Sequence, residues 1–167
     1  MSETNIARPR VLVADPDPET SALLARSLEW AGYEVTTAAN GREALDLTTR
    51  LRPAAAVLEI KMELLNGYEV VRALREGGHK LPIVMVSARA GKLDRDFAFT
   101  VGADDYVKKP FHSSELVARL GMLVPVPNKA VAPEAPKPKP IARPARPSRV
   151  SRTPYRQLRP VPALATR

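Results

Sequence analysis

Five short apolar segments, spaced almost evenly along the first 110 residues, constrain the fold of this chain most strongly. Their centres lie near residues 12, 35, 57, 85 and 107, so each interval has room for one helix and its loops. Residues 11–14, 55–58 and 83–86 are apolar throughout, which is typical of parallel strands covered on both faces. The spacing therefore predicts five strands that alternate with helices.

Apolar residues at helical spacing occupy the intervals between these segments. Asp17 followed by Pro18 has the pattern of a helix N-cap with proline in the first helical position. Strand and helix alternation of this kind predicts an α/β fold with a doubly wound, five-stranded parallel sheet, and with functional groups at the carboxyl ends of the strands. The residues that repeat every three or four positions are Leu24, Leu28 and Ala31; Ala44, Leu47 and Leu51; Val70 and Leu74; Phe97 and Val101; and Leu116, Leu120 and Leu123.

The last 43 residues have a different composition from the rest. Residues 125–167 contain 11 of the 17 prolines and ten basic side chains against one acid, so the net charge of +8 describes this tail and not the nearly neutral remainder. Few large apolar side chains are left to stabilise a fold there, and disorder is expected. We predict a flexible N-terminus at 1–9, one domain at 10–124, and a Pro/Arg/Ala-rich basic tail at 125–167.

Composition excludes several classes of site. The chain has no cysteine, which removes disulfides, thiolate nucleophiles and cysteine metal sites. Its two histidines, His79 and His112, are too few and too far apart for a zinc cluster. The N-terminus lacks a signal pattern and no uncharged apolar run approaches the length of a membrane span, so a cytoplasmic protein is expected.

Several motifs lie where the predicted strands end. They are VLVADPDP at 11–18, the single residue Glu59, NGYEV at 66–70, Ser87-Ala88, and GADDYVKKPF at 102–111. In this order and spacing they resemble the receiver domain of bacterial two-component response regulators, over residues 11 to about 124. The resemblance implies a flavodoxin-like fold and phosphoryl transfer from a histidine kinase to an aspartate. Mg²⁺ would then be held by two adjacent acids, the acceptor carboxylate and a backbone carbonyl.

Matched to that family, the chain keeps some positions and departs from two. Pro16 stands where the second acid should be, and Glu59 stands where the family has the phosphoacceptor aspartate. Proline supplies no carboxylate for a metal. Glutamate is one methylene longer, and a displacement of about 1 Å can cost on the order of a hundredfold in positioned chemistry. The remaining matches are Asp15 as first acid, Lys61 for the carbonyl, Ser87 for the hydroxyl, Tyr106 for the switch aromatic and Lys109 for the lysine.

These departures lead to the hypothesis of an atypical pseudo-receiver. It would act through protein binding without phosphorylation at Glu59, whose longer arm would reach Lys109 and imitate the phosphorylated state. No catalytic activity and no metal site are predicted; Asp15 and Glu59 are the candidates if Mg²⁺ binds. Asp17 either replaces the lost ligand or caps a helix. The alternative is a phosphorylatable single-domain regulator that uses another acceptor.

Two partner surfaces are predicted. A signalling protein, either a histidine kinase or a downstream regulator, would bind the surface of the fourth helix, fifth strand and fifth helix, near Lys92, Arg95, Lys108 and Arg119. Dispersed arginines in the tail suit phosphate or carboxylate groups of nucleic acid, an acidic protein or an anionic lipid surface. Two alternatives remain for the tail. In one it is an inert, solvated appendage; in the other it carries the function itself, as a tether to DNA, RNA or a membrane. These arginines are Arg143, Arg146, Arg149, Arg152, Arg156 and Arg159.

Overall fold

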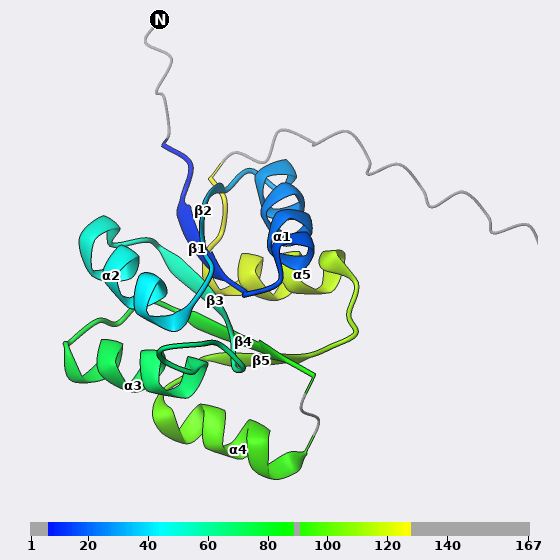
Figure 1. Ribbon diagram of the computed structural model, residues 1–167. Coiled ribbons are helices and arrows are strands. Elements are labelled where there is room, and N and C mark those ends of the chain that lie inside the picture. The colour runs from blue at the N-terminus through cyan, green and yellow to red at the C-terminus, as the bar shows by residue number, and fades with distance from the viewer. Residues whose placement is uncertain (1–6, 89–90, 128–167) are drawn as a thin grey trace, which may run out of the picture. The chain divides into compact units, whose positions relative to one another are not determined.

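The computed structural model of the protein describes residues 7–88 and 91–127, so residues 128–167 of the predicted tail and residues 1–6 of the predicted flexible N-terminus lie outside the described residues. Five strands and five helices alternate in this part of the chain (Figure 1). The strands are β1 (Arg10–Ala14), β2 (Glu34–Ala38), β3 (Ala55–Glu59), β4 (Ile83–Ser87) and β5 (Asp105–Lys108). The helices are α1 (Pro18–Trp30), α2 (Gly41–Leu51), α3 (Gly67–Glu76), α4 (Lys92–Val101) and α5 (Ser113–Leu123).

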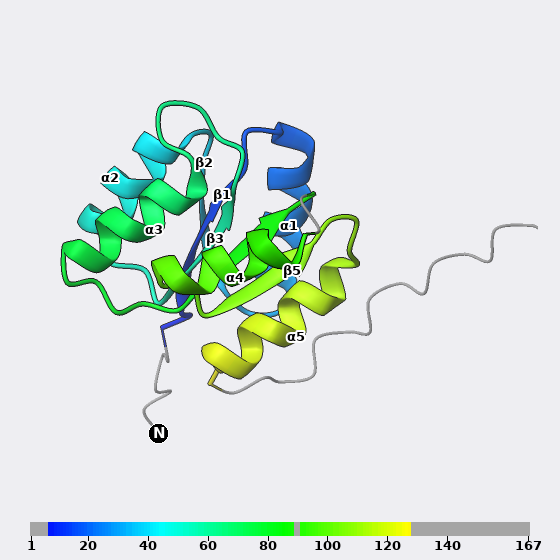
Figure 2. The same cartoon turned by 90° about the horizontal axis from the view of Figure 1, so that it is seen from below.

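The strands form one parallel sheet in the order β2-β1-β3-β4-β5. Figures 1 and 2 show α1 and α5 on one face of the sheet and α2, α3 and α4 on the other. Side chains from alternate strand positions therefore enter two separate cores, one under each helical layer. Strands β3 and β4 are buried along their whole length, as their continuous apolar sequences predict. The predicted α/β fold class is confirmed.

Side-chain caps fix where three helices begin at the carboxyl edge of the sheet. Asp17 caps α1 and Pro18 takes the first helical position, as predicted. Asn40 caps α2, and Asn66 caps α3 in a reciprocal capping box with Glu69. Among residues 7–88 and 91–127, no helix is both long and apolar enough to span a bilayer.

The apolar stripe predicted for the fourth helix is wrong in part. Phe97 is 43% exposed, and Ala98 is the buried residue of α4. The Phe97 ring instead packs edge-on against Tyr68 at the start of α3, with 4.8 Å between ring centroids. Helix α4 meets the core through the buried Ala98 and the partly buried Val101, so the predicted repeat was right about Val101 and wrong about Phe97.

A close approach behind the end of β3 requires glycine at position 67. A Cβ atom at Gly67 would lie 2.4 Å from the carbonyl oxygen of Glu59 and 2.9 Å from the Cα of Ile60. The N–H of Gly67 also donates to the carbonyl of Ile60 at 2.8 Å. The start of α3 is thus held directly against the backbone that presents Glu59.

Replacing Gly67 with alanine is expected to lower the free energy of unfolding by about 1–3 kcal/mol, because backbone must move to admit the methyl group. Urea unfolding followed by circular dichroism measures the effect. The matched control is Gly121→Ala in α5, where a Cβ would meet only ordinary contact, 3.8 Å from the Tyr33 hydroxyl. That variant is expected to gain about 0.5–1 kcal/mol from helix propensity. Equal stability of the two variants would contradict the close-approach argument.

Candidate functional site

Three charged side chains from separate strand ends meet at the carboxyl edge of the sheet. Asp15 follows β1, Glu59 ends β3 and Lys109 follows β5. Strands β1 and β3 are neighbours, whereas β5 lies beyond β4, so the long lysine side chain crosses the end of β4 to reach both acids. The topology therefore brings together residues that are up to 94 positions apart in the sequence.

Lys109 is shared by the two carboxylates. Its Nζ lies 2.7 Å from Oδ2 of Asp15 and 2.7 Å from Oε2 of Glu59. The side chains of Asp15 and Glu59 are only 3% and 8% exposed, and that of Lys109 is 24% exposed. Two desolvated carboxylates thus depend on one ammonium group, and removing that group would leave both without a counter-charge. The predicted contact of Glu59 with Lys109 is present.

The second oxygen of Glu59 folds back onto the chain that follows it. Oε1 accepts hydrogen bonds from the backbone N–H groups of Ile60 at 2.7 Å and Lys61 at 3.1 Å. The extra methylene of glutamate gives the carboxylate the reach to do this while Oε2 stays on Lys109. Sequence reasoning missed these two donors, because backbone N–H groups carry no signal in residue identity.

The surroundings of Lys109 stabilise its charged form. Desolvation by burial works against the ammonium, but hydrogen bonds and opposite charges from Asp15 and Glu59 outweigh it, and they raise the pKa of Lys109 above the ordinary value for lysine. A lysine whose pKa is higher in the folded state adds stability below its unfolded pKa. That contribution is lost as the pH rises through the higher folded value.

The acids at this edge do not fit a magnesium ion. Both oxygens of Asp15 already accept hydrogen bonds, Oδ1 from the N–H of Asp17 at 2.9 Å and Oδ2 from Lys109. Both oxygens of Glu59 are occupied as described above, and Pro16 supplies no oxygen from its side chain. Within the described part of the chain, no group of three or more potential metal-ligating side chains is present. A hard cation that needs several free oxygens would have to displace this network.

Asp17 is a helix cap and does not join the other two acids. Its Oδ2 accepts from the N–H of Thr20 at 3.1 Å and also from the Thr20 hydroxyl. The hydrogen bond from the Thr20 hydroxyl, and to a smaller extent that from the Thr20 N–H, lowers the pKa of the exposed Asp17 carboxyl below its ordinary value. Of the two interpretations that the sequence left open for Asp17, the observed contacts correspond to the cap.

Ser87 and Tyr106, the residues matched to the family's hydroxyl and switch aromatic, are both buried. Ser87 is buried at the end of β4, and its carbonyl accepts from the N–H of Lys109 at 2.8 Å. Tyr106 on β5 is 8% exposed. The peptide bond between Lys109 and Pro110 is cis. Ser87 and Lys109 thus lie at the carboxyl edge of the sheet, whereas Tyr106 lies in the first half of β5, paired with Met85.

The basic residues predicted to lie at a partner surface do come together. Lys92 and Arg95 of α4, Lys108 of β5 and Arg119 of α5 line one cavity of about 540 Å³, with Tyr106 among them. Arg119 is also held by Asp105, 3.1 Å away. The tail arginines predicted to bind anions lie outside the described residues.

The sequence matches a known family model over most of the folded part. Residues 11–121 match the model described as "Response regulator receiver domain". The chain is 46% identical over 122 residues to "Transcriptional regulatory protein PrrA" of Mycobacterium leprae, covering 73% of this chain and 52% of that protein. It is 46% identical over 115 residues to "Response regulator MprA" of Mycolicibacterium vanbaalenii, covering 69% and 50%. The chain thus spans about half the length of these curated relatives.

Solved structures show the same fold. The receiver domain of the Francisella response regulator 1452 aligns with a TM-score of 0.68 and 31% identity, covering 70% of this chain and 96% of that one. The Vibrio cholerae chemotaxis protein CheY4 aligns with a TM-score of 0.67 and 30% identity, covering 71% and 100%. Both alignments cover nearly all of the known domain.

Lys109→Met is expected to destabilise the protein by about 2–4 kcal/mol, somewhat less than the loss of a partner from a fully buried pair, because Lys109 keeps some contact with water. Adding Glu59→Gln should recover part of that loss, giving a coupling energy of about 1–3 kcal/mol in a double-mutant cycle. Urea unfolding of the 167-residue chain provides the four free energies. Lys92→Met, at an exposed position, serves as control and should stay within about 0.5 kcal/mol of the original. Additive effects at positions 59 and 109 would refute the shared ion pair.

Proposed function

Because the chain belongs to the response regulator receiver domain family, we propose that it acts in two-component or related signalling as a pseudo-receiver. In this proposal it binds a signalling protein without being phosphorylated at Glu59. The observation that carries the proposal is the 2.7 Å contact between Lys109 Nζ and Glu59 Oε2.

The contact between Lys109 and Glu59 supports the proposal because the corresponding lysine of receivers has a role in recognising the phosphoryl group. The resemblance to receivers implies that this lysine contacts an oxygen of the phosphoryl group on the acceptor aspartate. Here an oxygen of Glu59 takes that place, and the ion pair requires no metal. The carboxylate is also no longer free to attack a phosphoryl donor, since one oxygen is on Lys109 and the other accepts two backbone hydrogen bonds. We infer that Glu59 fixes one conformational state.

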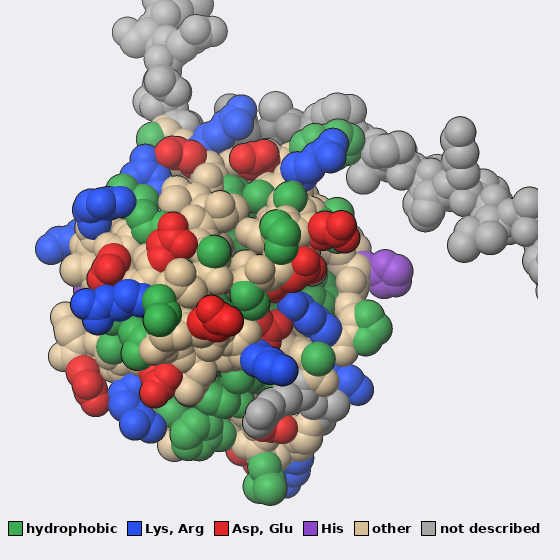
Figure 3. Space-filling view, in the orientation of Figure 1, with side chains coloured by type: hydrophobic (Ala, Val, Ile, Leu, Met, Phe, Trp, Pro, Cys, Tyr) green, Lys and Arg blue, Asp and Glu red, His purple; other side chains and the backbone are tan. Residues whose placement is uncertain are grey.

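The surface of α4, β5 and α5 supports binding to a protein partner. It combines the basic residues around the 540 Å³ cavity with exposed hydrophobic side chains on α4. Leu93 is 83% exposed and Phe99 is 38% exposed, with the Arg95 guanidinium 5.7 Å from the Phe99 ring centroid. Figure 3 shows hydrophobic side chains gathered over α4 on the visible face. A partner with apolar and acidic groups would complement this surface.

The basic tail is proposed as an auxiliary tether. Its ten basic side chains against one acid favour an anionic partner, and counterion release would make any contact with nucleic acid strongly dependent on salt. This role is secondary to that of the receiver surface, because nothing in the tail sequence provides a module for reading a specific partner.

The 167-residue protein, incubated with acetyl phosphate and Mg²⁺, is expected to gain no phosphate adduct by intact mass spectrometry. Glu59→Asp alone should also fail, because Pro16 still withholds one metal ligand. The double variant Pro16→Asp/Glu59→Asp is expected to become phosphorylated, since it restores both departures from the family pattern. A stoichiometric adduct on the unaltered chain would contradict the proposal. Mapped to Asp17 or another acid, it would favour the alternative acceptor instead.

Partner binding is tested by capture from nuclease-treated lysate of the native cell, using the full chain and the variant Lys108→Glu. A protein retained by the original chain and lost by the variant is expected, because Lys108 lines the cavity between α4 and α5. Arg26→Glu, an exposed charge reversal on α1 that does not line the cavity, is the matched control and should retain the protein. Two outcomes would mean that partners bind through the tail and not through the receiver surface. One is loss of all binding on nuclease treatment; the other is release of the captured protein by modest salt, equally from both variants.

A further inference from the structure

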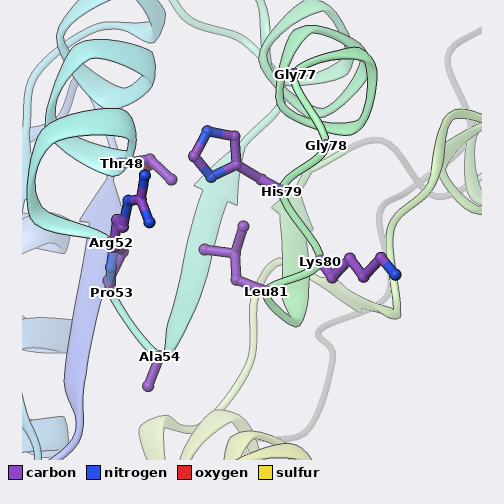
Figure 4. Close-up of a pocket in the computed structure, with 9 residues that line it drawn as sticks. All are labelled: Thr48, Arg52, Pro53, Ala54, Gly77, Gly78, His79, Lys80 and Leu81. Carbon is purple, nitrogen blue, oxygen red and sulfur yellow. The ribbon is translucent and has the colours of Figure 1, made fainter.

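A second pocket lies at the opposite, amino edge of the sheet. It has a volume of about 460 Å³ and lies between the end of α2 and the turn that joins α3 to β4 (Figure 4). Its volume falls within the range of small-molecule sites, about 300–1,000 Å³. We call it the amino-edge pocket; its lining residues are Thr48, Arg52, Pro53, Ala54, Gly77, Gly78, His79, Lys80 and Leu81.

The turn on one side of this pocket is held firmly by Arg75. Its Nη1 donates to the carbonyls of His79 and Leu81, both at 2.9 Å. Its Nε and Nη2 donate to the carbonyl of Gly102, and Nη2 also reaches Asp104 at 2.9 Å. The N–H of His79 donates to the carbonyl of Leu74. The backbone that carries the His79 side chain is therefore positioned before any ligand arrives, which lowers the ordering cost of binding.

The charge of the amino-edge pocket is positive. Arg52, His79 and Lys80 contribute to its lining, and none of its lining residues is acidic. Within residues 7–88 and 91–127, the side chains of Arg52 and His79 have no ion pair or hydrogen bond. Figure 4 shows these two side chains facing each other across the pocket, whereas the Lys80 side chain points away from them.

The backbone places Arg52 at this position. Arg52 adopts the left-handed conformation, with φ of 47°, and its N–H donates to the carbonyl of Thr48 at 3.0 Å. Non-glycine residues seldom adopt this conformation. Pro53 follows at once and is buried, so the chain turns sharply out of α2 and the Arg52 side chain stands at the pocket.

Helix dipoles alone do not account for this positive charge. Helices α2 and α3 both end beside the pocket, and each helix C-terminus carries about half a negative elementary charge in partly screened form. The partial negative charge at these helix ends attracts cations, and it explains in part why arginine and lysine occur beside the pocket. The formal charges of Arg52 and Lys80 together exceed these partial charges, and the charge of Arg52 is the one that faces the pocket.

We propose that the amino-edge pocket binds a small phosphate monoester. The phosphate group lies between the Arg52 guanidinium and the His79 imidazole, and the organic group lies against Pro53 and Leu81. Guanidinium offers a planar fork of donors that matches phosphate oxygens, and the imidazole N–H adds another donor. This site is independent of Glu59, since it lies at the other end of the strands.

The test is an NMR titration of the full 167-residue chain with AMP and with glucose 6-phosphate. Adenosine and glucose are the uncharged counterparts. A saturable shift of the backbone amides of Gly77, Gly78 and Leu81, caused by a phosphate ester and not by its counterpart, is expected. Arg52→Gln and His79→Gln should each weaken binding at least tenfold.

Arg50→Gln is the matched control, because it removes an exposed arginine from the same helix end without altering the lining. It should change the dissociation constant less than twofold. Equal weakening by Arg50→Gln and Arg52→Gln would mean non-specific attraction and would overturn the proposal. The proposal would also be overturned if neither AMP nor glucose 6-phosphate caused a saturable shift, or if adenosine and AMP caused equal shifts.

Discussion

One ammonium group shared between two buried carboxylates dominates the chemistry of this receiver. Lys109 must cross the end of β4 to reach Asp15 and Glu59, and it can do so only because the sheet order brings β1, β3 and β5 to the same edge. Two acids that nearly lack contact with water would repel each other without it. The sheet topology, the close packing at Gly67 and the identity of residue 109 thus serve a single electrostatic arrangement.

That arrangement also explains why the departures at Pro16 and Glu59 belong together. A receiver that binds Mg²⁺ needs free oxygens at this edge. Loss of the acid at position 16 removes one ligand, and glutamate at position 59 occupies its own oxygens with Lys109 and two backbone N–H groups. Each change favours a closed network over an open metal site. A reversion of one position alone therefore leaves the other departure from the metal site in place.

Sequence reasoning succeeded where one residue type has one geometric consequence. Apolar runs predicted the strands, Asp17 before Pro18 predicted the cap, and the longer arm of Glu59 predicted its contact with Lys109. It failed where tertiary packing decides. Phe97 repeats at helical spacing with Val101, yet Ala98 and Val101 pack against the core while the Phe97 ring packs against Tyr68. The amino-edge pocket was equally invisible, since it exists only where two loops distant in sequence meet.

The two edges of the sheet differ in how their charges are compensated, and this bears on how such a domain could respond to a signal. At the carboxyl edge the charges of Asp15, Glu59 and Lys109 are already paired with one another. At the amino edge the charges that line the pocket remain open to a ligand. Arg75 joins the turn of that pocket to Gly102 and Asp104, which directly precede β5. A ligand at the amino edge would therefore lie against a turn that hydrogen bonds of Arg75 connect to the start of β5.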